Sequence, residues 1–122
     1  MSWLAVAVGG ALGSIARHAV NQWTRNYLFP AGTLAVNVSG CLVIGLVAGL
    51  IAERRIDLPV HWRQFVFTGL LGGFTTFSTF GLDTFTLART LSSRYAALNV
   101  GLQVAGGLFA VWFGYRVGTM PN

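Results

Sequence analysis

The sequence predicts an all-α integral membrane protein in which four transmembrane helices cross the bilayer. Only 9% of the 122 residues are charged, whereas a soluble domain carries about 25%. The mean hydropathy is +0.65. Four apolar segments nearly use up the chain, because each crossing needs about 20 residues. We therefore expect residues 1–122 to form a single four-helix transmembrane domain.

The first predicted span covers roughly residues 3–23 and is rich in glycine. Gly9, Gly10 and Gly13 have the spacing of small residues that lets two helix backbones approach closely. Arg17 lies in the second half of this span, where a charge is costly unless it meets water, a partner or the lipid headgroups. Two interpretations of Arg17 stay open: a side chain that reaches the interface, or a residue in the vestibule of an ion path.

The second predicted span covers roughly residues 33–52 and contains one side-chain amide, that of Asn37. An amide at membrane depth either bonds to a neighbouring helix or lines a polar path, and the sequence leaves both open. Gly45 and Gly49 have the spacing of a close helix contact. The single cysteine, Cys41, excludes a disulfide within the chain and is expected to be a small packing residue.

The third apolar segment, roughly residues 62–90, is longer than one straight crossing requires. We expect this third helix to be broken mid-membrane around Gly72 and Gly73, since each glycine in a helix interior costs about 1 kcal/mol relative to alanine. A new helix after the break would carry Phe77 and Phe80 at i and i+3, so both rings would project from nearly the same face.

Hydroxyl and amide groups surround this aromatic face. Ser78 and Thr79 follow Phe77 directly and supply hydroxyl groups. The amides come from the fourth predicted span, which covers roughly residues 95–117. Within it, Asn99 and Gln103 are i and i+4, which places both amides on one helix face.

Arginine counting indicates almost no preferred orientation in the membrane. Four spans put both termini on one side, and the positive-inside rule compares the arginines of the two sides. Arg54, Arg55, Arg63 and Arg116 lie on the terminal side, against Arg25, Arg89 and Arg94 on the other. Two copies inserted in opposite directions can pair about a two-fold axis, so we expect an antiparallel, dual-topology homodimer.

The residue types favour a neutral anion path over enzyme chemistry. His18 and His61 are far apart and Cys41 is single, so no metal-ligand cluster or catalytic triad is visible, and the sparse charges argue against nucleic-acid binding. Amide N–H groups, hydroxyls and the positive edges of phenylalanine rings suit a small anion that must also leave quickly. The plainer interpretation is that the phenylalanines and glycines only pack helices.

Four motifs together resemble the CrcB family, the Fluc-type fluoride channels of bacterial inner membranes. They are residues 13–17 (GSIAR), 32–40 (GTLAVNVSG), 72–80 (GGFTTFSTF) and 110–114 (AVWFG), which match the family's four spans in order. The resemblance covers essentially the whole chain, and the motif of the third span is the most specific.

The resemblance implies a passive, fluoride-selective channel that exports cytoplasmic fluoride and so reduces its toxicity. It would be a multi-pass protein of the bacterial cell inner membrane, an antiparallel homodimer with two pores, and not an enzyme. Carried over, Asn37, Phe77, Ser78, Thr79 and Phe80 would line the fluoride pore.

The remaining sites implied by the resemblance lie at the pore ends and at the break. Arg17 would lie in the vestibule, and a structural sodium ion would be bound by the backbone carbonyls of Gly72 and Thr75. The family's hydroxyl track in the fourth span is replaced here by the amides of Asn99 and Gln103, and its usual glutamate after the core motif is Asp83.

Two rival functions remain at this stage. A small exporter of organic cations is expected to have a buried carboxylate in its first span, and residues 3–23 contain none. A structural membrane subunit without transport of its own would use the same glycines and phenylalanines only for packing.

Overall fold

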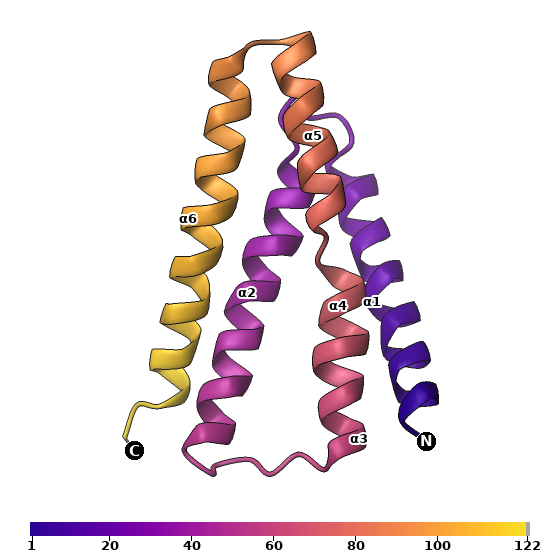
Figure 1. The fold of residues 1–122 in the computed structure, drawn as a ribbon, viewed down its shortest axis with the longest axis vertical. Helices are drawn as coiled ribbons and strands as arrows, with labels where there is room; N and C mark the ends of the chain where they lie inside the picture. Colours follow the sequence, from indigo (N-terminus) through magenta and orange to yellow (C-terminus); the bar gives the residue numbers. More distant parts are fainter. Residues whose placement is uncertain (122) are drawn as a thin grey trace.

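The computed structural model describes residues 1–121, and within them the chain is all-helical with four segments long and apolar enough to cross a membrane (Figure 1). The predicted four spans are therefore confirmed. Helix α1 covers Ser2–Thr24, α2 covers Ala31–Ala52 and α6 covers Ser93–Gly118. The third segment, Val60–Thr90, consists of α3 (Val60–Arg63), the π-helical η1 (Gln64–Leu71), α4 (Gly72–Phe74) and α5 (Phe77–Thr90).

Two helix pairs build the fold. α2 packs along α6, and α1 packs along η1 and α4, with α2 lying between α6 and the third segment (Figure 1). The buried stripe of α6 includes Asn99, Gln103 and Gly107, which confirms the predicted shared face. Small residues allow the contact with α2, because a Cβ at Gly114 would collide with the carbonyl oxygen of Leu42.

α1 approaches the third segment equally closely. A Cβ at Gly13 would lie 2.8 Å from the backbone nitrogen of Phe74 and would collide with the carbonyl oxygen of Leu70. A Cβ at Gly9 would lie 2.5 Å from the carbonyl oxygen of Phe65. The predicted role in close backbone packing is confirmed for Gly9 and Gly13, whereas a Cβ at Gly10 would meet nothing within 4 Å.

The backbone of the third segment leaves the helix at Thr75 and Thr76, which have extended conformations (φ −86°, ψ 158° and φ −154°, ψ 119°). Gly72 and Gly73, where the sequence placed the interruption, are themselves helical. Close packing explains this shift, since a Cβ at Gly73 would lie 2.5 Å from the carbonyl oxygen of Gly10. Gly73 therefore serves the contact with α1, and other residues end the helix.

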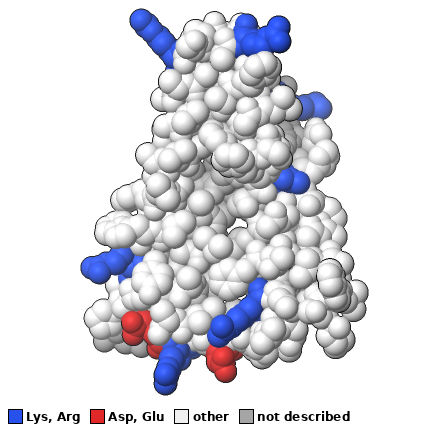
Figure 2. All heavy atoms as spheres, in the orientation of Figure 1, with Lys and Arg blue, Asp and Glu red and all other residues white. Residues whose placement is uncertain are grey.

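The surface has the pattern of a membrane protein. Both termini lie at the same end of the bundle (Figure 1). On the face shown in Figure 2, the acidic side chains lie only at that end, while arginines occur toward both ends. Many large apolar side chains of the spans are exposed, including Leu12, Ile15, Leu108 and Phe109. Such a surface fits lipid rather than water.

Candidate functional site

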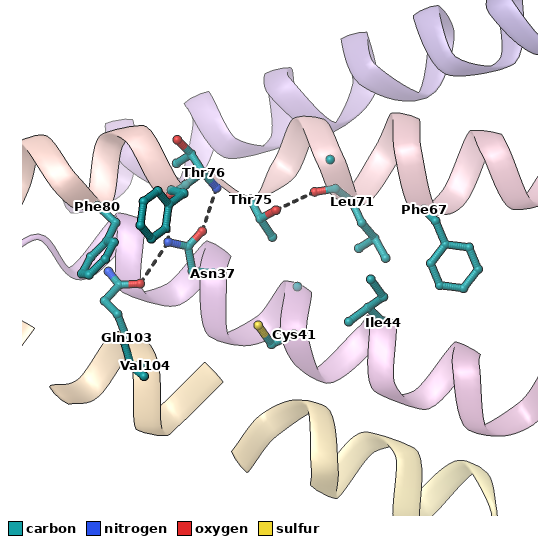
Figure 3. Close-up of a pocket in the computed structure, with 13 residues that line it drawn as sticks. Asn37, Cys41, Ile44, Phe67, Leu71, Thr75, Thr76, Phe80, Gln103 and Val104 are labelled. Atoms are coloured by element: carbon teal, nitrogen blue, oxygen red, sulfur yellow. Dashed lines mark hydrogen bonds between the residues drawn. The ribbon is translucent and has the colours of Figure 1, made fainter. Parts of the chain in front are cut away.

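A cavity of about 350 Å³ lies beside the interruption, between α2, α6 and the third segment (Figure 3). None of the 13 residues that line it carries a charge. It brings together six of the predicted site residues, which are Asn37, Gly72, Thr75, Phe77, Phe80 and Gln103. Thr76 and Cys41 also line it, and neither was predicted as a site residue.

The side chain of Asn37 binds both backbone groups of Thr76. Its Oδ1 accepts from the Thr76 N–H across 2.8 Å, and its Nδ2 donates to the Thr76 carbonyl oxygen across 3.0 Å. In a continuous helix the Thr76 N–H would donate to the carbonyl of Gly72. Asn37 therefore replaces a helical hydrogen bond and fixes the backbone at the interruption.

The hydroxyl of Thr76 starts α5. Its Oγ1 accepts from the N–H of Thr79 across 3.2 Å, which satisfies one of the free donors at the helix N-terminus. The same hydroxyl donates to Thr79 Oγ1 (3.1 Å) and lies 3.3 Å from Ser78 Oγ. Ser78 and Thr79 thus join the site through Thr76. A threonine directly before the predicted helix of Phe77 and Phe80 was the sequence signal that could have identified Thr76 as the N-cap.

Phe77 and Phe80 form an edge-to-face pair, with ring centroids 5.4 Å apart and planes at 61°. The prediction that both rings lie on one side of the helix is confirmed for α5. Phe80 is half-buried, whereas Phe77 is 82% exposed. One ring therefore packs inside this chain and the other points to its surface.

Two buried amides reach the site from α6. Gln103 Oε1 accepts from Asn37 Nδ2 across 2.9 Å, and Gln103 Nε2 is buried without a partner among the described residues. Asn99 is 0% exposed and lies one turn away, where its Nδ2 donates to Thr84 Oγ1 across 2.9 Å. Thr84 in turn donates to the carbonyl oxygen of Phe80 (2.8 Å). Asn99 is thus near the site without lining the cavity.

Two ionisable groups contact the ends of this region. Arg17 Nη1 donates to the Thr75 carbonyl oxygen across 3.4 Å. Asp83 lies farther along α5, and its Oδ2 accepts a hydrogen bond from the hydroxyl of Thr33 on α2 across 2.7 Å. Neither charged residue lines the cavity, so the cavity wall consists of neutral groups. Among residues 1–121, no cluster of three or more His, Cys, Asp or Glu side chains is placed to hold a metal ion.

Known proteins resemble this chain along most of its length. Residues 4–115 match the family described as "CrcB-like protein, Camphor Resistance (CrcB)". The "Fluoride-specific ion channel FluC" of Rhodospirillum rubrum is 44% identical over 100% of this chain and 98% of its own length. The protein of the same name from Acidobacterium capsulatum is 44% identical over 97% of this chain and 96% of its own length. The one from Rhizobium leguminosarum bv. trifolii is 50% identical over 88% of this chain and 80% of its own length. These relatives are named as ion channels, not enzymes, and the chain belongs to the CrcB family.

Proposed function

We propose that this protein is a passive channel selective for fluoride, which releases the ion from the cytoplasm and so reduces its toxicity. The observation that carries the proposal is the uncharged cavity at the interruption, where phenylalanine rings meet amide and hydroxyl groups. Neutral donors bind a small anion without the strong attraction that a fixed cation would exert, so the ion also leaves quickly. The relatives named fluoride-specific ion channels support the choice of anion.

The proposed ion path follows α5 past the cavity. Asn37, Phe77 and Phe80 form its wall, and Ser78 and Thr79 add hydroxyl groups at the start of α5. Ring edges carry the positive part of the aromatic quadrupole, which attracts an anion. Arg17 lies in the vestibule, and the amides of Asn99 and Gln103 continue the polar track along α6.

The working unit of the proposal is an antiparallel, dual-topology homodimer in the bacterial inner membrane. The 82% exposure of Phe77 in a single chain supports it, because a pore residue needs protein on its other side. The nearly even arginine count of the two ends also supports insertion in both orientations. In such a dimer the interruption would lie at membrane depth, where irregular backbone is tolerated only inside protein or beside a water-filled cavity.

The proposal includes a structural sodium ion held by the carbonyls of Gly72 and Thr75. The residues fit a cation, because Asn37 takes the N–H that would otherwise bond to the Gly72 carbonyl. The Thr75 carbonyl also lacks a helical partner, because the N–H of Thr79 donates to Thr76 Oγ1. The guanidinium of Arg17, which donates to this carbonyl, would have to turn aside for sodium to bind. In a two-fold symmetric dimer, the Gly72 and Thr75 carbonyls of both chains would together provide a set of oxygen ligands. The bound ion would supply positive charge that joins the two chains.

Fluoride efflux from liposomes that contain only this purified chain tests the function, with chloride efflux as the control. Rapid release of fluoride without chloride is the expected result. A folded dimer that releases neither ion would refute the channel and favour the structural-subunit function. Export of an organic cation driven by a proton gradient would instead favour the exporter.

Phe80→Ile tests the ring-edge contact, because isoleucine keeps much of the bulk without the aromatic quadrupole. Its matched control is Phe85→Ile, on the same helix but 59% exposed and outside the cavity. We expect fluoride release to fall sharply in Phe80→Ile and to stay near the original rate in Phe85→Ile. Equal rates in the two variants would exclude the proposed role of Phe80.

A further inference from the structure

We propose that the turn between α2 and the third segment binds the headgroup of a phospholipid that carries both a phosphate and a primary ammonium group, as phosphatidylethanolamine does. A cavity of about 430 Å³ lies at this turn, lined by Ile51, Arg54, Ile56, Asp57 and Arg63. Its volume is in the range of small-ligand sites. It shares no lining residue with the cavity of the proposed ion path, so this inference does not depend on channel activity.

The turn lies where the lipid headgroups are expected. α2 ends at Ala52 and the third segment starts at Val60, so two apolar spans hold residues 53–59 at the membrane surface. Both termini lie at the same end of the bundle (Figure 1), where the acidic side chains and several arginines gather on the face shown in Figure 2. A cavity at this end is therefore within reach of phospholipid headgroups rather than acyl chains.

Arg54 holds a backbone position that usually belongs to glycine. Its φ is 55°, the one positive φ of a non-glycine residue in the described part of the chain. Its N–H donates to the Ile51 carbonyl oxygen (3.0 Å) and that of Arg55 to the Leu50 carbonyl oxygen (2.9 Å), the Schellman motif that ends α2. Glycine adopts this left-handed conformation without steric cost, whereas arginine does not. An arginine at such a position is expected to serve a contact outside the chain.

Arg63 brings a second cation to the cavity, and its own helix does not favour one there. It lies in the first turn of the third segment, where the helix dipole disfavours a positive charge. Its Nε donates to the Leu58 carbonyl oxygen across 2.9 Å, which orients the guanidinium. The N–H groups of its terminal nitrogens have no protein acceptor within residues 1–121. The negative dipole end of α2 accounts for a cation at Arg54 but not for this one.

Asp57 gives the cavity a preference among phosphate headgroups. Its carboxylate lines the same cavity, yet among the described residues no ion pair or hydrogen bond joins it to Arg54 or Arg63. Guanidinium groups bind phosphate well, but a headgroup with only a phosphate would also face the like charge of Asp57. A phosphoethanolamine group matches both signs, because its phosphate accepts from the arginines and its ammonium donates to the carboxylate. Phosphatidylcholine has methyl groups in place of those N–H donors, and phosphatidylglycerol has no ammonium group.

Native mass spectrometry of the purified protein in detergent tests the site, with dioleoyl phosphatidylethanolamine, phosphatidylcholine and phosphatidylglycerol added separately. We expect phosphatidylethanolamine to bind about tenfold more tightly than the other two, the effect of one added hydrogen bond between charged groups. Equal affinities for the three lipids would overturn the proposal. Soluble phosphoethanolamine, which lacks acyl chains, should not displace the lipid. Displacement at similar concentrations would mean that the ligand is a free phosphate ester and not a lipid.

Two variants separate the contributions of the charges. Asp57→Asn should abolish the preference for phosphatidylethanolamine over phosphatidylglycerol, while Arg63→Gln should weaken the binding of both lipids about tenfold. The matched controls are Glu53→Gln, in the same turn, and Arg116→Gln, in the last turn of α6, both exposed and outside the cavity. A preference that survives Asp57→Asn, or control variants that act as strongly as the cavity variants, would contradict the proposed site.

Arg54→Gly distinguishes a lipid contact from a role in the fold, because the expected effects on binding and on stability have opposite signs. Glycine fits the positive φ, so the variant should melt at a higher temperature in lipid-free detergent. Its affinity for phosphatidylethanolamine should fall about tenfold. Undiminished binding would exclude Arg54 from the site, and a lower melting temperature would show that this arginine serves the fold instead.

Discussion

The contact between α1 and the third segment gives the sharpest test of the fold, through Gly13→Ala compared with Gly10→Ala. A Cβ at position 13 would meet backbone atoms of Leu70 and Phe74, and backbone cannot turn aside as a flexible side chain can. A Cβ at Gly10 meets nothing within 4 Å in the chain. Both glycines lie in α1, so each variant gains about 1 kcal/mol of helix propensity.

The difference between the two variants isolates the collision, because the propensity gain cancels. Overpacking a close contact costs about 1–3 kcal/mol, so Gly13→Ala should be less stable than Gly10→Ala by about that amount. The measurement is unfolding of the detergent-solubilised protein by a denaturing detergent, followed by the fluorescence of its four tryptophans. If the two variants unfold at the same denaturant concentration, the described approach of α1 to the third segment is wrong.

Three further changes test the site. Thr76→Val keeps the side-chain volume but removes the N-cap of α5, so it should lower the free energy of unfolding by about 1 kcal/mol in the same assay. The control is Thr90→Val, at an exposed position at the end of the same helix, which should change the free energy of unfolding little. Thr33→Val removes the hydroxyl that donates to Asp83 and should destabilise the protein by about 1–3 kcal/mol. An unchanged unfolding midpoint would contradict the importance of this hydrogen bond. Replacement of sodium by N-methyl-D-glucamine should lower the melting temperature of the protein if the carbonyls of Gly72 and Thr75 hold sodium. An equal melting temperature in both salts would count against that site.

The helices were predictable because their signal is carried by composition and length alone. Runs of apolar residues with few charges identify spans whatever their neighbours are, and the glycine spacings of α1 and α2 correctly indicated close contacts. The shared face of Asn99 and Gln103 followed from helix periodicity.

The position of the interruption was not predictable in the same way. Local propensity pointed to Gly72 and Gly73, but both residues stay helical, and α1 packs closely against Gly73. The helix ends where Asn37, 39 residues earlier in the sequence, takes the N–H of Thr76. A hydrogen bond between distant segments leaves no periodic pattern in the sequence, and the bond between Asn37 and Gln103 is hidden for the same reason.

The pairing of Asn37 with the Thr76 backbone also has a consequence for biogenesis. An irregular peptide unit entering lipid with its N–H and C=O unpaired would be strongly disfavoured during insertion. Asn37 belongs to α2, which leaves the ribosome before the third segment does. A polar partner is therefore already in the membrane when Thr76 arrives, and the order of the spans along the chain suits the order in which each chain assembles.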